Sequence, residues 1–417
     1  MDRTLLENLF NAAVAQAQPA LAVEQNLPAK PKGRTIVIGA GKASAQMARA
    51  FEKAWDGELS GLVVTRYGYA EACERIEIIE AAHPVPDAAG AEAARRLMQL
   101  VSGLSEDDLV VALISGGGSS LLPAPVPGLD LEDEQEINKA LLASGAPIGI
   151  MNLIRNQFST IKGGRLAAAC APARVATLVV SDVPGDDPAL VASGPTLPLA
   201  GGRTEARRLA ALYRLDLPEP AAKILAGDDN LPPDAADPVF ARNSVTTIAS
   251  AALSLEAAAD LARQHGIEAV ILSDSIEGEA RDVALVHAAM AREISARNRP
   301  FSKPVVLLSG GETTVTLRGK GRGGRNGEFL LSLAIALDGV ENISALAGDT
   351  DGIDGSEDNA GAFVDGGTAS RMRQAGIDPQ AALANNDAYS AFESIGDLFV
   401  TGPTGTNVND FRAIIIR

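Results

Sequence analysis

Glycine-rich segments in the C-terminal third of this 417-residue sequence carry charged side chains suited to phosphate chemistry. Ser309-Gly310-Gly311-Glu312 follows an apolar run, and the basic glycine loop 319–328 contains Arg325. The acidic loop Gly348-Asp349-Thr350-Asp351-Gly352 comes next. Phosphoryl transfer needs backbone N–H groups and cations to hold phosphate oxygens, and it needs carboxylates to hold Mg²⁺. The order of these segments therefore indicates chemistry on a phosphate group.

A shorter glycine motif, Gly39-Ala40-Gly41-Lys42, lies near the N-terminus. It resembles a dinucleotide-binding turn, but Ser44 occupies the third glycine position. The next expected strand ends in Thr65-Arg66, where an NAD-binding fold has an acidic partner for the ribose. Ala43 also excludes a Walker loop, which needs Ser or Thr after the lysine. We expect Lys42 to face an anion from the start of a helix; a tight turn with a surface lysine is the alternative.

Two further segments offer ligands for anions. Ser115-Gly116-Gly117-Gly118-Ser119 follows an apolar run, and successive backbone N–H groups in such a turn form an anion-binding nest. A flexible hairpin tip is the alternative. The segment 152–165 is expected to be helical, which would place Arg155 and Lys162 on one face beside Asn156. This arrangement predicts capture of a substrate carboxylate; a solvated basic helix end is the alternative.

Carboxylates after apolar runs are the candidates for proton transfer and metal binding. Asp182 is placed to accept a hydroxyl proton or to hold a metal. Asp349 and Asp351 resemble a calcium loop, but Ile353 stands where an EF-hand needs Asp or Asn. We therefore expect these carboxylates to share Mg²⁺ with phosphate oxygens, unless the loop is simply an acidic surface loop. Asn407 lies in another polar loop and is a candidate ligand or an ordinary turn residue.

The overall composition bounds the class of protein. With 46% hydrophobic and 21% charged residues, the chain is globular. A net charge of −17 and 4% aromatic residues exclude a general nucleic-acid footprint. Cys73 and Cys170 are too far apart in sequence for a Cys-type zinc site, and two cysteines fit a reducing compartment. Without an apolar signal or spanning segment, we expect a cytoplasmic protein that binds no membrane.

Apolar runs that alternate with helical segments predict an α/β fold with two domains. The predicted domains are residues 1–238, a larger Rossmann-like domain with a doubly wound parallel sheet, and residues 239–417, a smaller α/β domain. Residues 197–240 are expected to be helix plus linker. The expected strands cover residues 35–38, 61–65, 109–114, 175–180, 245–249, 269–273, 304–308, 343–347 and 398–401.

Taken together and in this order, the motifs resemble the glycerate 2-kinase family, whose members have a large N-terminal domain and a smaller C-terminal MOFRL domain. The resemblance covers essentially the whole chain. It rests on Gly39 to Lys42, Ser115 to Ser119, Asn156 to Arg165, Ser181 to Asp186, Ser309 to Glu312 and Gly348 to Gly352.

The resemblance implies phosphorylation of D-glycerate at its 2-hydroxyl, with ATP and Mg²⁺ as cofactors and an active site in the cleft between the domains. It assigns stabilisation of the transferred phosphoryl group to Lys42 and Arg325. Many relatives carry the label hydroxypyruvate reductase, so an NAD(P)H-dependent reductase is the first alternative. His83 is the histidine that such a reductase could use. A non-catalytic binding module is the second alternative, and a homodimer is left open.

The candidate site residues fall into groups by expected role. The expected catalytic residues are Lys42, Arg325 and Asp182. The expected ligands of substrate or phosphate are Ser115, Gly116, Gly117, Gly118, Ser119, Asn156 and Lys162. The expected ligands of ATP are Gly39, Gly41, Gly311, Glu312, Asp351, Gly352 and Asn407. The expected metal ligands are Asp182, Asp349 and Asp351.

Overall fold

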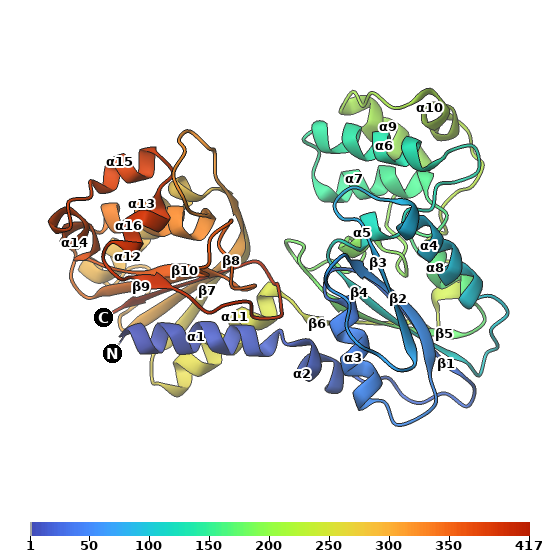
Figure 1. Ribbon diagram of the computed structural model, residues 1–417, viewed down its shortest axis with the longest axis horizontal. Helices are drawn as coiled ribbons and strands as arrows, with labels where there is room; N and C mark the ends of the chain where they lie inside the picture. The colour runs from blue at the N-terminus through green and yellow to red at the C-terminus, as the bar shows by residue number, and fades with distance from the viewer. Residues whose placement is uncertain (1) are drawn as a thin grey trace. The chain divides into compact units, whose positions relative to one another are not determined.

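The computed structural model describes residues 2–417, which form two compact units (Figure 1). The N-terminal unit is Pro19–Ile248. The C-terminal unit combines Ala249–Arg417 with the N-terminal segment that ends at Gln18. These ranges differ from the predicted 1–238 and 239–417, because the first helix belongs to the C-terminal unit and a strand that we expected to open the second domain belongs to the first sheet.

The N-terminal unit is built on a six-stranded sheet of order β3-β2-β1-β4-β5-β6. Strands β1 to β5 are parallel. This is the strand order of a Rossmann fold, in which the direction of winding reverses between β1 and β4. The strands are β1 (Thr35–Ala40), β2 (Ser60–Arg66), β3 (Ile76–Ala81), β4 (Leu109–Ser115), β5 (Arg174–Val180) and β6 (Ser244–Ala249).

Both faces of this sheet are buried, as the unbroken apolar sequences of β1 and β4 require. On one face, Ile36 and Ile38 of β1 share a core with α4 (Ala88–Leu100) and α8 (Arg165–Ala169). The opposite-facing Val37 is also buried. Helix α3 (Ser44–Ala54) contacts β1, β2 and β4, and α2 (Pro19–Glu24) packs on α3.

A cluster of helices in the same unit has an apolar core of its own, which contains Ile137, Leu141, Ile154 and Leu209. Two of these helices lie in the segment that we expected to be helix plus linker. The helices are α6 (Leu131–Ala143), α7 (Ile148–Arg155), α9 (Arg203–Leu212) and α10 (Glu219–Ala226). Short helical turns complete the unit: α5 (Gly118–Leu121), η1 (Asn156–Phe158), η2 (Val191–Ser193) and η3 (Pro238–Phe240).

The C-terminal unit has a mixed six-stranded sheet of order β11-β10-β9-β12-β8-β7. The last strand, β12, lies in the middle, antiparallel to both β8 and β9. Its register pairs Asp410 with Gly311 on one side and with Asp349 on the other. The strands are β7 (Glu268–Glu279), β8 (Val305–Thr314), β9 (Ile343–Asp349), β10 (Gly361–Asp365), β11 (Leu398–Phe399) and β12 (Asp410–Ile416).

Helices cover both faces of this second sheet (Figure 1). One face carries α1 (Asp2–Gln16) and α11 (Ala251–Gln264). Phe10 of α1 meets Phe399 and Phe411 edge to face, with ring centroids 5.0 and 5.7 Å apart, so this helix is part of the C-terminal core. The other face carries α12 (Ala280–Arg297) and α13 (Arg325–Ala336), beside α14 (Thr368–Gln374), α15 (Pro379–Ala384) and α16 (Ala388–Glu393).

Two kinds of element depart from the sequence prediction. Strands β3, β10 and β12 were not predicted, and α1 belongs to the C-terminal unit although residues 1–238 were assigned to the N-terminal domain. The remaining expected strands are present with ends shifted by a few residues, most of all β7 and β8, which continue through residues expected to form loops. None of the helices in residues 2–417 combines the length and apolar character needed to cross a membrane.

Candidate active site

In the N-terminal unit, the candidate site lies where β1 and β4 end side by side, at the point where the sheet reverses its winding. Ligands of open α/β sheets bind at this position. A Cβ atom on Gly41 would lie 2.1 Å from the hydroxyl of Ser115, and one on Gly116 would lie 1.7 Å from an Asp182 carboxylate oxygen. Glycine is therefore required at position 41, and at position 116 the Asp182 side chain after β5 lies directly against the glycine loop.

Lys42 and His83 reach the same loop from other elements. A Cβ atom on Gly117, which has a φ of +80°, would lie 2.9 Å from His83 Nε2 and 3.1 Å from Lys42 Cε. The Lys42 backbone N–H donates to the Gly116 carbonyl over 2.8 Å. Burial lowers the pKa of His83, and the nearby charges of Lys42 and Arg66 lower it further. Lys42 and Arg66 thus bring positive charge to the surroundings of this loop, as an oxyanion site requires, and the Asp182 carboxylate lies against it as well.

Arg66 is a member of this charged group that the sequence analysis did not select. Its position at the end of β2, where an NAD-binding fold carries an acidic residue, was the available signal. The Arg66 guanidinium lies 3.6 Å from the ring centre of Tyr69. Its buried Nε has no hydrogen-bond partner among the described residues.

Ser115 holds the glycine loops together through its own side chain. Its hydroxyl accepts a hydrogen bond from the Ala43 backbone N–H over 3.0 Å and lies 3.1 Å from the Ser44 hydroxyl. Ser115 is buried, so its side chain fixes the turn after β1 against the end of β4. Gly39 has a packing reason as well, because a Cβ atom there would lie 2.4 Å from the Leu113 carbonyl oxygen.

The segment 152–165 is not the single helix that we expected, so Arg155 and Lys162 do not share a helix face. Helix α7 ends at Arg155 because the chain turns into η1. Lys162 is buried, and its ammonium donates to Glu134 over 2.6 Å and to the Leu122 carbonyl over 3.0 Å. Such a satisfied, buried pair supports the fold around the nest instead of offering a cation to a ligand.

Asn156 is also buried, and its side chain binds backbone carbonyl groups. With its amide oriented to satisfy both ends, its nitrogen donates to the carbonyls of Asn152 and Ser193, each over 3.2 Å. Ser119 has a side-chain partner, because its hydroxyl lies 2.9 Å from that of Ser193. Asn156 and Ser119 are therefore both tied to the segment around Ser193.

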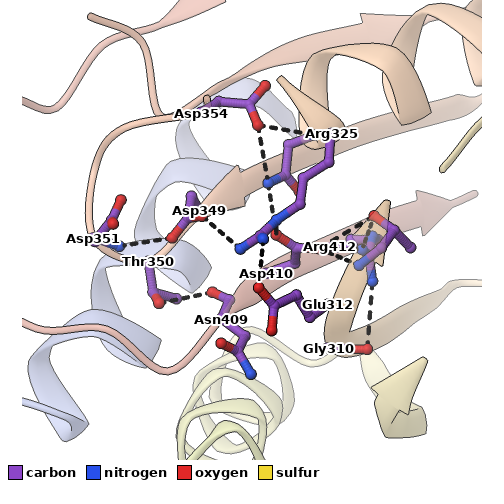
Figure 2. A network of polar contacts seen from close by, with 12 residues as sticks. Gly310, Glu312, Arg325, Asp349, Thr350, Asp351, Asp354, Asn409, Asp410 and Arg412 are labelled. Carbon is purple, nitrogen blue, oxygen red and sulfur yellow. Dashed lines mark hydrogen bonds and ion pairs between the residues drawn. The ribbon is translucent and has the colours of Figure 1, made fainter. Parts of the chain in front are cut away.

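In the C-terminal unit, the candidate site is centred on Arg325 at the start of α13 (Figure 2). Its guanidinium donates to Asp410 over 2.6 Å, to Glu312 over 2.8 Å and to Asp349 over 2.8 Å. These carboxylates come from the ends of β12, β8 and β9, which the sheet register places side by side. The structure thus brings Arg325, Glu312 and Asp349 together, as one site requires, and their roles toward phosphate stay a prediction.

Asp410 is the functional candidate that the sequence analysis missed. One of its oxygens accepts hydrogen bonds from Arg325 and Asn326, and the other accepts from Arg412 over 2.5 Å and from Thr313. The side chains of Asp410 and Arg412 are both buried. A charged pair at the start of an otherwise apolar strand was the signal in the sequence, since charges are rarely buried unless they are paired.

Burial dominates the electrostatics of this network. It raises the pKa of Asp349 to about 8, with Asp351 and Asp410 raising it further and Arg325 opposing them. It also raises the pKa of Asp354 to about 6, although this carboxylate accepts the backbone N–H groups of Asn326 and Gly327. Burial and the neighbouring carboxylates disfavour the charged form of Asp349, and an added cation beside it would favour that charged form.

The acidic loop offers a small donor set for such a cation. The Asp351 N–H donates to Asp349 over 3.1 Å, and the Asn407 amide makes a long 3.5 Å contact with the Asp351 carboxylate. Among residues 2–417, no cluster of three or more His, Cys, Asp or Glu side chains is arranged to hold a metal ion. Mg²⁺ is commonly bound through one or two carboxylates, with phosphate oxygens and waters as the other ligands. Asp349 and Asp351 fit that pattern.

Two other predicted ATP ligands, Gly311 and Gly352, are glycines at positions where the neighbouring backbone leaves no space for a side chain. A Cβ atom on Gly311, which has a φ of +120°, would lie 2.2 Å from the Ile276 nitrogen, where β7 and β8 change register. A Cβ atom on Gly352 would lie 2.1 Å from the Gly402 carbonyl oxygen. Gly311 shapes the part of β8 that carries Glu312, and Gly352 shapes the loop that carries Asp351.

Comparisons with known proteins agree with this architecture. The family model named Domain of unknown function (DUF4147) matches residues 5–226, and the MOFRL family matches residues 305–410. D-glycerate 2-kinase from Thermotoga maritima is 40% identical over 98% of this chain and 97% of its own length. A protein from Agrobacterium vitis with the provisional name hydroxypyruvate reductase is 53% identical over 99% of this chain and 94% of its own length.

A solved structure shares the whole fold. The crystal structure of glycerate kinase from Thermotoga maritima superposes with a TM-score of 0.91, at 38% sequence identity and over 99% of both chains. Identity at this level over the full length extends the likeness from the fold to the family. The chain therefore belongs to the glycerate 2-kinase family, as a member that carries both the DUF4147 and the MOFRL domain.

Proposed function

We propose that this protein transfers the γ-phosphoryl group of ATP to the 2-hydroxyl of D-glycerate, which yields 2-phosphoglycerate and ADP. The observation that carries the proposal is the loop 115–119 at the β1/β4 switch point, where the side chains of Lys42 and Asp182 lie close against glycines. A small oxyanion and a hydroxyl are the groups that such a site would accept. The names of the family members point to the same substrate.

In the proposed reaction, a bond forms between the glycerate 2-oxygen and the γ-phosphorus, and the bond from that phosphorus to the bridging oxygen of ADP breaks. Asp182 accepts the hydroxyl proton. Lys42 and Arg325 stabilise the charge on the transferred group. Lys42 belongs to the N-terminal unit and Arg325 to the C-terminal unit, so we propose that catalysis takes place where the two units enclose the substrates.

Mg²⁺ is the cofactor that the acidic loop would serve in this proposal. Asp349 and Asp351 would hold it together with phosphate oxygens of ATP. When bound, it neutralises part of the triphosphate charge. Glu312, which is half exposed beside Arg325, would remain at the edge of the nucleotide site.

The position of phosphorylation has a direct test. Purified protein is incubated with ATP, MgCl₂ and D-glycerate, and the product is examined by proton-coupled phosphorus NMR. A phosphate on the CH–O carbon gives a doublet, whereas one on the CH₂–O carbon gives a triplet. We expect the doublet of 2-phosphoglycerate. A triplet would support a kinase activity but refute phosphorylation at the 2-hydroxyl. The absence of any new phosphate ester would refute the kinase activity.

A reductase of hydroxypyruvate is the second candidate, because the strand order is that of dinucleotide-binding folds and two relatives from Agrobacterium vitis carry this name. The residue at the end of β2 and the turn after β1 do not fit a reductase. Arg66 stands where an NAD ribose would meet an acidic residue, and Ser44 replaces the third glycine of the dinucleotide turn. The kinase therefore explains more of the site.

A further inference from the structure

Arg155 is a buried cation whose hydrogen-bond partners are neutral. It is 9% exposed; its Nε donates to Asn138 over 2.7 Å, and one terminal nitrogen donates to Asn152 and, over 3.2 Å, to the Ser193 hydroxyl. The carboxylate that acts on it electrostatically, Glu134, is already bonded to Lys162. One carboxylate therefore serves two buried cations. Burying a charge without a partner of opposite charge is costly, so we look for a function of the positive charge on Arg155.

The segment that meets Arg155 has a strained backbone. Ala192 and Ser193 have φ values of +54° and +61°, a left-handed conformation that is unfavourable for residues other than glycine. The segment is fixed by backbone hydrogen bonds from Gly163 to the Ser193 carbonyl, over 3.1 Å, and from Gly164 to the Gly194 carbonyl, over 2.7 Å. Strain of this kind persists where the surroundings enforce it, and it clusters at functional sites.

The strained conformation places the Ser193 hydroxyl between the buried cation and the nest. Ser193 is 1% exposed, and its Oγ lies 2.9 Å from the Ser119 hydroxyl and 2.9 Å from the Asn152 side-chain oxygen. The methyl carbon of Ala192 lies 2.7 Å from where a Cβ atom on Gly118 would be. A continuous chain of contacts thus runs from Arg155 through Ser193 to the loop 115–119.

The hydroxyl proton of Ser193 has two possible acceptors. It can be donated to Ser119 or to the Asn152 oxygen, each 2.9 Å away, and that oxygen also accepts from Arg155. Arg155 donates to Ser193, and a donated hydrogen bond polarises the hydroxyl that receives it. When Ser193 donates its proton to Ser119, the proton of Ser119 is left to point out of the chain, toward an acceptor in the nest.

We propose that Ser193 is a positioning residue that couples the charge of Arg155 to Ser119, so that the Ser119 hydroxyl donates a hydrogen bond to an oxyanion held by the nest. The oxyanion is a carboxylate or a phosphoryl oxygen. In glycerate phosphorylation these are the glycerate carboxylate and the transferred group of ATP, so this assignment of the ligand rests on the proposed function.

The test compares Ser193→Ala with Ser193→Gly by steady-state kinetics. Both variants lack the hydroxyl, but glycine also relieves the left-handed strain. A hydrogen bond to a charged group corresponds to about a 10- to 100-fold change in affinity, so we expect KM to rise by that factor in both variants, with a smaller change in kcat. A rise for D-glycerate identifies the carboxylate as the ligand, and a rise for ATP identifies the phosphoryl group.

Ser144→Ala is the matched control, because the Ser144 hydroxyl donates to a helix carbonyl in the same unit. We expect wild-type KM values for it. Unchanged KM values for both substrates in folded Ser193→Ala and Ser193→Gly would overturn the proposal. Recovery of wild-type KM in Ser193→Gly alone would also overturn it, because strain and not the hydroxyl would then explain the loss.

A failure of the proposed function can be told apart from a failure of this inference. If the wild-type protein releases no ADP with D-glycerate, the same variants are titrated calorimetrically with inorganic phosphate. Binding at least about 10-fold weaker than wild type would still support Ser193 as the positioning residue. Equal binding, or no binding by the wild type, would overturn it.

Discussion

At the scale of single residues, Arg325 binds carboxylates of very different exposure. The Asp410 side chain is 0% exposed, whereas that of Glu312 is 51% exposed. Asp410 also carries the buried pair with Arg412. An exposed ion pair contributes little to stability because water screens it, but removing one partner of a buried pair leaves the other charge without compensation.

We therefore expect Asp410→Asn to lower the free energy of unfolding by about 3–5 kcal/mol, because it leaves the buried Arg412 without its carboxylate. The matched variant Glu312→Gln should change it by less than about 1 kcal/mol. Urea unfolding followed by circular dichroism measures both. Equal effects of the two substitutions would contradict the buried network.

Lys42 is the cation closest to the glycine loop of the N-terminal unit. As a stabiliser of the transferred charge, it should be needed mainly in the transition state. We expect Lys42→Ala to lower kcat about 100-fold or more. The control is Lys53→Ala, an exposed lysine on α3, which should keep wild-type turnover. Near-normal kcat for Lys42→Ala would show that Lys42 is not a catalytic residue.

At the scale of elements, the close approach of β4 and β5 ends is what allows the loop 115–119 to lie against Asp182. Gly116→Ala would put a Cβ atom 1.7 Å from the Asp182 carboxylate, so either the loop or Asp182 must move. Because a displacement of about 1 Å costs about 100-fold in rate, kcat/KM should fall by about that factor. Gly202→Ala, with a φ of −89° and open space around it, is the control and should keep its activity. Similar activities for both variants would contradict this geometry.

The packing of α12 on β8 buries His287, and we expect this histidine to make the free energy of unfolding depend on pH. The His287 Nδ1–H donates to the Val283 carbonyl over 2.9 Å, and Nε2 accepts from the Ser309 hydroxyl over 3.0 Å. Burial is the main cause that lowers the pKa of His287 from 6.5 to about 4. Between these values the unfolded state binds more protons than the folded state, so the free energy of unfolding falls as the pH is lowered from 6.5 toward 4.

We expect this histidine to account for a loss of about 2 kcal/mol between pH 7 and pH 5. His287→Gln should remove that part of the slope, because glutamine does not titrate. Urea unfolding of both proteins at the two pH values measures the difference. Parallel pH profiles would show that the imidazole does not change its protonation on unfolding.

The elements also explain which parts of the site the sequence could predict. The loops after β1, β4 and β5 were predictable, because each follows an unbroken apolar run and parallel strands end at one edge of a sheet. Asp410 was not, because it meets Arg325 and Asp349 through β12, the last strand, which inserts between β8 and β9. The pairing of Lys162 with Glu134 was equally hidden, since it joins residues that no local pattern connects.

At the scale of the whole molecule, a net charge of −17 opposes the binding of anionic substrates. Local cations offset this charge: Lys42 and Arg66 lie near His83 and the N-terminal loop, and Arg325 lies near the acidic loop. Each unit supplies one of the proposed catalytic cations, and neither carries the whole set. We therefore expect turnover to require both units, with phosphoryl transfer as the chemistry.

The most direct test is a paired assay on the purified full-length protein. One arm measures ADP release with D-glycerate, ATP and Mg²⁺, and the other measures NAD(P)H oxidation with hydroxypyruvate. We expect glycerate-dependent ADP release and no loss of NAD(P)H. Oxidation of NAD(P)H without ADP release would contradict the kinase, and with it the phosphate-binding roles of Lys42, Arg325 and the acidic loop.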